Sequence, residues 1–212
     1  MNLDEIATQA QEITGFNIQT SQLVLLTRAQ WREATYPEQI YGFYSPGKGI
    51  AFVNKDSPSL RPTIYHELFG HGLFCEWSRI GRAIVQRDQE HVTPVTEHQY
   101  VDTYEGFAVW LEHKLCTLND DESAFKQTLL NRPEEYSRAF SQSNDVEQNF
   151  GTWGVMCAAG FPKKDILANL RACLPRFFKE EYSTFPLVLA YGYRKEHADT
   201  DVFIVSQDKN LH

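Results

Sequence analysis

Residues 65–72 (YHELFGHG) place two histidines and a glutamate inside one apolar run, and this spacing limits the folds open to the chain. His71 follows His66 by five positions. Side chains five positions apart lie roughly 140° apart around a regular α-helix, so the two imidazoles could not bind one ion. One inserted residue, a single-turn π-bulge, would bring both rings to the same face, and Gly70 has no Cβ to oppose the distortion. The stretch therefore predicts a bulged helix whose two histidines share one metal ion.

A second stretch, residues 104–110 (YEGFAVW), supplies an acid for such a site. Glu105 lies in an apolar helical context, where a buried charge needs a partner. Gly106 and Ala108 are small and would let this helix lie close to the histidine helix. The two stretches together predict a zinc site with three protein ligands, the two histidines and Glu105, and one open position.

Glu67, next to the first histidine, is predicted to be the general base that accepts a proton from water at the metal. Glu112 and His113 are rival third ligands, and Glu112 shares a helix face with Glu105. The simpler alternative is that both histidines are ordinary helix residues and that Glu67 is a surface acid.

Both stretches resemble motifs of known gluzincins, a class of zinc peptidases. Residues 66–72 (HELFGHG) are similar to the HELLGHG motif of dipeptidyl peptidase III, which has the same extra residue and takes a glutamate from a later helix as third ligand. Residues 105–108 (EGFA) resemble the glutamate helix of gluzincin aminopeptidases and of microtubule-associated tyrosine carboxypeptidases. The resemblance implies His66, His71 and Glu105 as zinc ligands and Glu67 as base.

The resemblance covers residues 65–110, and the chain departs from these families elsewhere. Its 212 residues are far fewer than those of dipeptidyl peptidase III, and its glutamate stretch does not match that family's. Some zincins place an aspartate four residues after the ligand glutamate to orient a zinc histidine, but Val109 has that position here. We therefore expect the orienting partner of the histidines to come from another part of the chain.

Composition excludes several other classes of protein. The formal net charge of -8 disfavours nucleic acid and anionic membranes as partners. The acidic N-terminus lacks the apolar region of a signal peptide, and no apolar run approaches the ~20 residues that span a bilayer. The four cysteines, none in a CxxC pair, are expected to be reduced thiols of a cytoplasmic protein; they are Cys75, Cys116, Cys157 and Cys173.

Hydrophobic periodicity and turn residues predict one α+β domain over residues 1–212, mostly helical and zincin-like, with a small N-terminal antiparallel sheet. Strands are expected at 21–27, which reads as buried, and in a hairpin of 40–44 and 50–54. Helices are expected at 3–14, about 59–79, 101–118, 120–130, 133–141, 146–159, 163–174 and 175–182, with a helical turn or a short helix at 28–34 and a loop at 81–99. Residues 185–193 are ambiguous, and 201–206 are strand-like.

A peptidase must also hold an extended substrate and stabilise an oxyanion. Zincins commonly use a strand before the zinc helix as the upper edge of the cleft, which here predicts Gly49, Ile50, Ala51, Phe52, Val53 and Asn54. The alternative is an ordinary strand inside the sheet. The predicted oxyanion donors are Tyr191, Tyr193, His197 and His98. The run 201–206 is expected to complete a sheet or to cover the cleft as an internal substrate mimic.

The function predicted from these residues is zinc-dependent hydrolysis of peptide bonds in a peptide or protein substrate. A zinc-binding interaction module is an alternative from another class, although Glu67 would then have no use as a base. A zinc hydrolase of small non-peptide amides is a third. The oligomeric state, the substrate and the choice between endopeptidase and exopeptidase action stay open.

Overall fold

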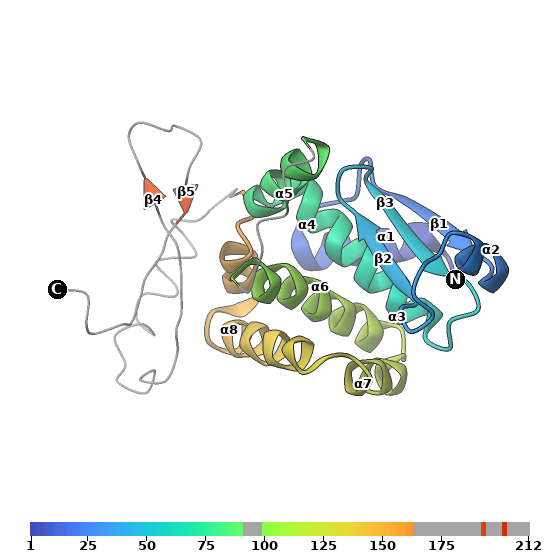
Figure 1. Ribbon diagram of the computed structural model, residues 1–212. Coiled ribbons are helices and arrows are strands. Elements are labelled where there is room, and N and C mark those ends of the chain that lie inside the picture. The colour runs from blue at the N-terminus through green and yellow to red at the C-terminus, as the bar shows by residue number, and fades with distance from the viewer. Residues whose placement is uncertain (91–98, 163–191, 194–200, 203–212) are drawn as a thin grey trace.

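The computed structural model describes residues 1–90, 99–162, 192–193 and 201–202. Helices form most of this part of the chain, and a small sheet lies near its N-terminal end (Figure 1). The predicted α+β class is therefore confirmed.

Local capping signals fit the boundaries of the first helices. The Asn2 side chain accepts a hydrogen bond from the N–H of Asp4, and Gly15 ends that helix with a φ of 78°. Thr27 and Gln30 form a capping box at the start of the next. The elements are α1 (Leu3–Thr14), β1 (Gln22–Leu26), α2 (Arg28–Glu33), β2 (Gly42–Ser45), β3 (Ile50–Asn54), α3 (Leu60–Ile64), the π-helix η1 (Tyr65–His71), α4 (Gly72–Trp77), α5 (Arg79–Gln89), α6 (Gln99–Leu118), α7 (Glu122–Leu130), α8 (Glu134–Ala158), β4 (Gly192–Tyr193) and β5 (Asp201–Val202).

The N-terminal sheet has the strand order β1-β3-β2. β2 pairs antiparallel with β3, which confirms the predicted hairpin, whereas β1 pairs with β3 in parallel. The sheet is therefore mixed, not antiparallel. The strand predicted to be buried, β1, lies at an edge, and its Leu25 is 46% exposed. An apolar run shows that a strand packs on one face, but not which neighbour it joins.

The predicted substrate strand is not an edge strand. β3 has β1 on one side and β2 on the other, so its backbone groups are used within the sheet. The prediction that Gly49, Ile50, Ala51, Phe52, Val53 and Asn54 offer a free edge is wrong, because β1 joins the side that the hairpin leaves open.

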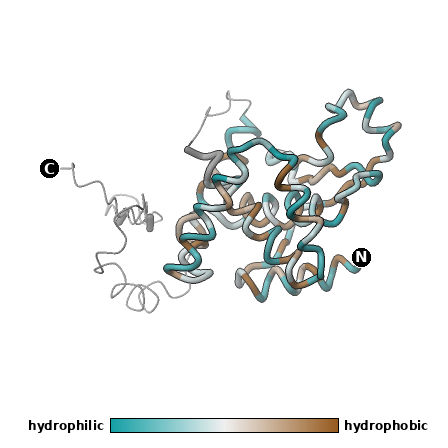
Figure 2. The backbone as a smooth tube through the Cα atoms, turned by 90° about the horizontal axis from the view of Figure 1, so that it is seen from below, coloured by the Kyte–Doolittle hydropathy of each residue, from teal (hydrophilic) through white to brown (hydrophobic). Residues whose placement is uncertain are grey.

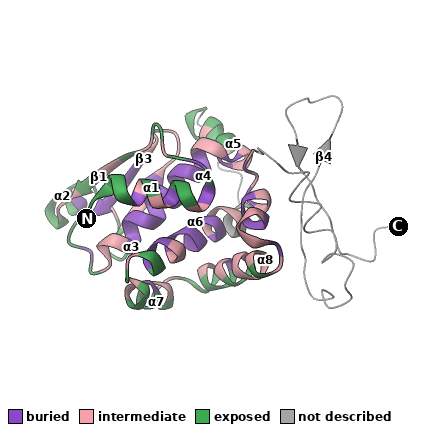
Figure 3. Ribbon diagram, turned by 180° about the vertical axis from the view of Figure 1, so that it is seen from behind, coloured by how far each residue is buried: buried purple, intermediate pink, exposed green. Residues whose placement is uncertain are grey.

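Three layers of helices lie at the centre of the fold. α3, η1 and α4 follow one another from Leu60 to Trp77, and α6 lies between this run and α8 (Figure 1). Residues 62–75 and 106–112 are buried without exception, whereas α7 and α8 expose one side (Figure 3). Apolar and polar residues alternate along most of the helices, as expected when one face is buried (Figure 2).

Two predicted helix boundaries are wrong. Ser78 has an extended conformation (ψ 142°), so α4 ends at Trp77, and the Ser78 side chain caps α5 by accepting the N–H of Gly81. Residues 81–89, predicted to belong to a loop, therefore belong to a helix. The helices predicted at 133–141 and 146–159 form one element, α8, whose bend lies at Gly151 (φ 71°).

The C-terminal predictions are described only in part. β5 pairs antiparallel with β4, so Asp201 and Val202 join a second, two-stranded sheet. The predicted helices at 163–174 and 175–182, and Cys173, lie outside the described residues. Within the described part of the chain Cys75, Cys116 and Cys157 are free thiols, and no helix there is long and apolar enough to cross a membrane.

Candidate metal centre

The histidine motif forms a π-helix from end to end. The N–H of Gly72 donates to the carbonyl of Glu67, five positions earlier, which confirms the predicted bulge. Gly70 has a role beyond the predicted one. A Cβ on Gly70 would lie 2.7 Å from both the Cα and the Cβ of Ala108 on α6. Glycine is required there because the two helices approach so closely.

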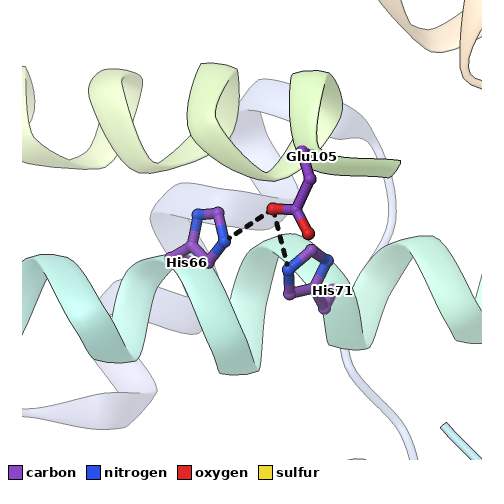
Figure 4. A group of neighbouring side chains, drawn as sticks. All are labelled: His66, His71 and Glu105. Carbon is purple, nitrogen blue, oxygen red and sulfur yellow. Dashed lines mark hydrogen bonds and ion pairs between the residues drawn. The ribbon is translucent and has the colours of Figure 1, made fainter. Parts of the chain in front are cut away.

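His66, His71 and Glu105 come together at this contact (Figure 4). The Glu105 Oε2 atom lies 3.1 Å from Nε2 of His66 and 3.4 Å from Nε2 of His71. One ligand atom from each residue lies within 4.8 Å of the other two, and both histidines are buried. The structure thus assembles the three predicted ligands into one group that could hold a metal ion.

Charges in this group compensate one another. Burial lowers the pKa of His66, but hydrogen bonds to Glu105 and Glu112 raise it to about 9. Burial raises the pKa of Glu105, but the two histidines hold it well below its usual range. Two imidazoles and one carboxylate are also the donor set of several catalytic zinc sites, so the residues present fit the predicted ion.

Glu67 lies beside the ligands without joining them. Its Oε2 atom is 4.0 Å from Nε2 of His71, and its side chain is only 10% exposed. Burial raises its pKa above the ordinary glutamate value, although the nearby histidines partly oppose this. β2 lies directly against this side chain, since a Cβ on Gly42 would lie 2.9 Å from Cγ of Glu67. A base here is close both to the metal donors and to a sheet edge.

Glu112 is the orienting partner that the sequence left unnamed. Its Oε2 atom lies 3.0 Å from Nδ1 of His66, on the opposite side of the ring from Glu105. Arg132, after α7, donates to the same oxygen. Burial raises the pKa of Glu112, but Arg132 and His66 lower it, and the carboxylate stays charged. A carboxylate behind a histidine ligand fixes the orientation of the ring.

Neither rival third ligand joins the metal group. Glu112 contacts His66 from behind, and His113 packs between Phe125 and Phe140 at ring distances of 4.8 and 5.0 Å. The position of Glu112, seven residues after Glu105 on one helix face, was the signal available in the sequence.

Two tyrosines complete the surroundings. Tyr104 stacks on His71, with ring centroids 3.8 Å apart and planes 17° apart. The ring centre of Tyr136, on α8, is 6.0 Å from that of His66. Burial and the charges of Glu105 and Glu67 raise the pKa of Tyr136, so its hydroxyl stays protonated.

The structure describes no side chain of the four predicted oxyanion donors. Tyr191, His197 and His98 lie outside the described residues, and of Tyr193 only the backbone, in β4, is described. Comparison with known proteins adds no family: no family model, curated protein or solved structure matches the chain. The case for a metal therefore depends on the geometry of the three donors.

Proposed function

We propose that the protein is a zinc-dependent hydrolase of peptide bonds. The observation that carries this proposal is the convergence of His66, His71 and Glu105 with the carboxylate of Glu67 beside them. When bound, zinc would supply Lewis acidity, which polarises a carbonyl group and lowers the pKa of water. The chain supplies the ligands, the base and the groups that position the substrate.

Glu67 is the proton acceptor in this proposal. Its raised pKa makes it a stronger base than an exposed glutamate, and its protonated form can pass the proton to the leaving amine. A protein that only stored zinc or used it as a structural ion would not need a buried carboxylate next to the ligands, and burial of that carboxylate is costly.

Tyr136 is the candidate oxyanion donor. Its ring centre lies 6.0 Å from that of His66, and it approaches the metal group from α8. A protonated hydroxyl beside the metal ligands can donate a hydrogen bond to a developing negative charge in the transition state.

The edge of β2 that faces away from β3, with which no described strand pairs, offers the main-chain partners of an extended substrate. Asn54 donates its N–H to the carbonyl of Tyr41, so these two residues are a hydrogen-bonded pair of the hairpin. Hydrogen-bonded and non-hydrogen-bonded pairs alternate along an antiparallel ladder. Gly42 and Tyr44 therefore belong to non-hydrogen-bonded pairs, and their N–H and C=O groups point away from β3. Gly42 is also the residue that lies against Glu67. A peptide that pairs with this edge would pass beside the base.

The edge favours a peptide over the two other candidate functions. A small non-peptide amide has no use for two outward pairs of main-chain groups, and an interaction module has no use for Glu67. Replacing one substrate amide near the cleaved bond by an ester removes an N–H donor, and we expect kcat/KM to fall about 3–10-fold. The same ester at the end of the peptide is the control.

Metal content and peptide cleavage of the full chain test the proposal. We expect about one zinc per chain, and its loss when His66 and His71 are both changed to alanine. The same donors also suit iron(II), so both metals are measured. Glu67→Gln should keep the zinc and lower cleavage of a mixed peptide library by ~10² or more. Glu5→Gln, an exposed change on α1, is the control.

Each outcome selects one function. A chain without bound metal overturns the proposal. A zinc-loaded chain that cleaves no peptide favours the interaction module, and cleavage of small amides alone favours the third candidate. Full activity of zinc-loaded Glu67→Gln would assign the base to another group.

A further inference from the structure

The two histidines of the metal group are held in different ways. His66 is fixed by a hydrogen bond from Nδ1 to the charged Glu112, which Arg132 holds in turn. Nδ1 of His71 is buried and has no hydrogen-bond partner among the described residues. On its Nδ1 side, therefore, no polar group holds the His71 ring in the orientation that directs Nε2 toward Glu105.

The ring of Tyr104 supplies the missing constraint. It lies parallel to the His71 ring at 3.8 Å, a separation that leaves no room for the imidazole to turn out of its plane. Tyr104 is itself fixed, because Phe74 packs edge-on against it at 5.4 Å. It is also the residue before Glu105, so α6 brings the third ligand and this ring together.

We propose that Tyr104 is a positioning residue that sets the ring plane of His71 and thereby tunes the affinity of the site for its metal. The inference rests on the proposed function, because the metal in question is the zinc ion that this function requires. The stack acts on His71, and the Glu112–Arg132 pair acts on His66. Loss of one constraint should therefore leave the other histidine in place.

Tyr104→Leu and Tyr104→Phe separate the stack from the hydroxyl. Leucine removes the aromatic face, and we expect about 10-fold weaker zinc binding in competition with a chelator, at the low end of the effect of groups that orient metal ligands. Phenylalanine keeps the aromatic face and loses only the hydroxyl group, so the zinc affinity of Tyr104→Phe should stay within about twofold of wild type. Tyr104→Met, which is also non-aromatic, replaces the leucine variant if that variant does not fold.

NMR of the metal-free protein gives a second reading of the same contact. A ring stacked at this distance shifts the His71 ring protons upfield, so the shift should disappear with leucine and persist with phenylalanine. Phe107→Leu is the matched control, because Phe107 is a buried aromatic of α6 that packs on Phe74, Trp110 and Phe161. It should lower stability and leave both readings unchanged.

Three results would overturn the inference. Zinc binding of Tyr104→Leu at wild-type strength would show that His71 needs no ring to orient it, and unchanged His71 resonances would show that the stack does not form. A wild-type chain that binds no metal would overturn both this role and the proposed function. A chain that binds zinc, responds to Tyr104→Leu and cleaves no peptide would retain the role of Tyr104 and lose only the function.

Discussion

Gly70→Ala tests the close contact that assembles the metal group. The new methyl would lie 2.7 Å from Cα and from Cβ of Ala108 and 3.2 Å from its carbonyl oxygen. Carbon atoms in ordinary contact lie about 3.5–4.0 Å apart, so η1 and α6 would have to separate by roughly 0.8 Å. Two of the three contacting atoms belong to the backbone and cannot swing aside. His71 follows Gly70 and Glu105 precedes Ala108 by one helical turn, so the separation moves metal donors on both sides.

The expected loss has two parts. Overpacking of a tight contact costs about 1–3 kcal/mol. Replacing glycine by alanine in a helix regains up to about 1 kcal/mol. We expect the free energy of unfolding of the metal-free chain to fall by about 1–2 kcal/mol and zinc affinity to fall at least about 10-fold, which corresponds to 1.4 kcal/mol.

Urea unfolding and competition with a chelator measure the two effects. Gly72→Ala, two positions along, is the matched control. Its methyl would meet Oγ and Cβ of Ser21 at 3.1 and 3.2 Å, and Cδ1 of Ile18 at 3.6 Å, which are side-chain atoms that can yield. It should change stability by less than about 1 kcal/mol and leave zinc affinity near that of wild type. Wild-type stability and zinc affinity in Gly70→Ala would refute the argument from helix spacing.

Three further predictions concern single side chains. Glu112→Gln leaves Arg132 without its charge partner and weakens the hold on His66, so zinc affinity should fall about 10–100-fold in a chelator competition, and unchanged affinity would contradict this role. Gly42→Ala would place Cβ 2.9 Å from Cγ of Glu67, so turnover should fall while the zinc content measured by metal analysis stays the same. Glu76 is partly buried, which raises its pKa, but hydrogen bonds from Ser21 and from the N–H groups of residues 19–21 lower the pKa below the unfolded value. Its contribution to stability is therefore present above about pH 4.3 and is lost as the pH falls through the folded-state pKa. The free energy of unfolding, measured with urea between pH 7 and pH 3, should depend less steeply on pH in Glu76→Gln than in wild type.

Local spacing made the centre of the site predictable. The five-residue offset between His66 and His71 cannot bind one ion without an extra residue in the helix, so the π-helix follows from the sequence alone. Glu105 was identifiable because an acid in an apolar helix needs a partner. The helix at 79–89 was also detectable, since Ile80, Ala83 and Ile84 have helical spacing after the cap at Ser78.

The parts that were not predictable depend on contacts between distant segments. Arg132 reaches Glu112 only because the turn between α7 and α8 lies against α6, and no local pattern encodes that placement. β1 could have paired with β2, with β3 or with neither strand of the hairpin. Its parallel pairing with β3 leaves β2, not β3, at an edge of the described sheet. The close approach at Gly70 likewise appears only when α6 is docked.

The π-helix in the middle of the core should reverse the usual gradient of hydrogen exchange along a helix when α6 undocks. A helix normally frays from its ends, whereas η1 joins α3 to α4 at the centre of one continuous run. π-helical turns are rare outside a supporting context, and here α6 and β2 provide that context by packing on η1. If α6 undocks as a local unfolding unit, the amides at the centre of the run should exchange before those at its two ends. The segment that carries the metal donors would then be the least protected part of its own helix whenever α6 is away.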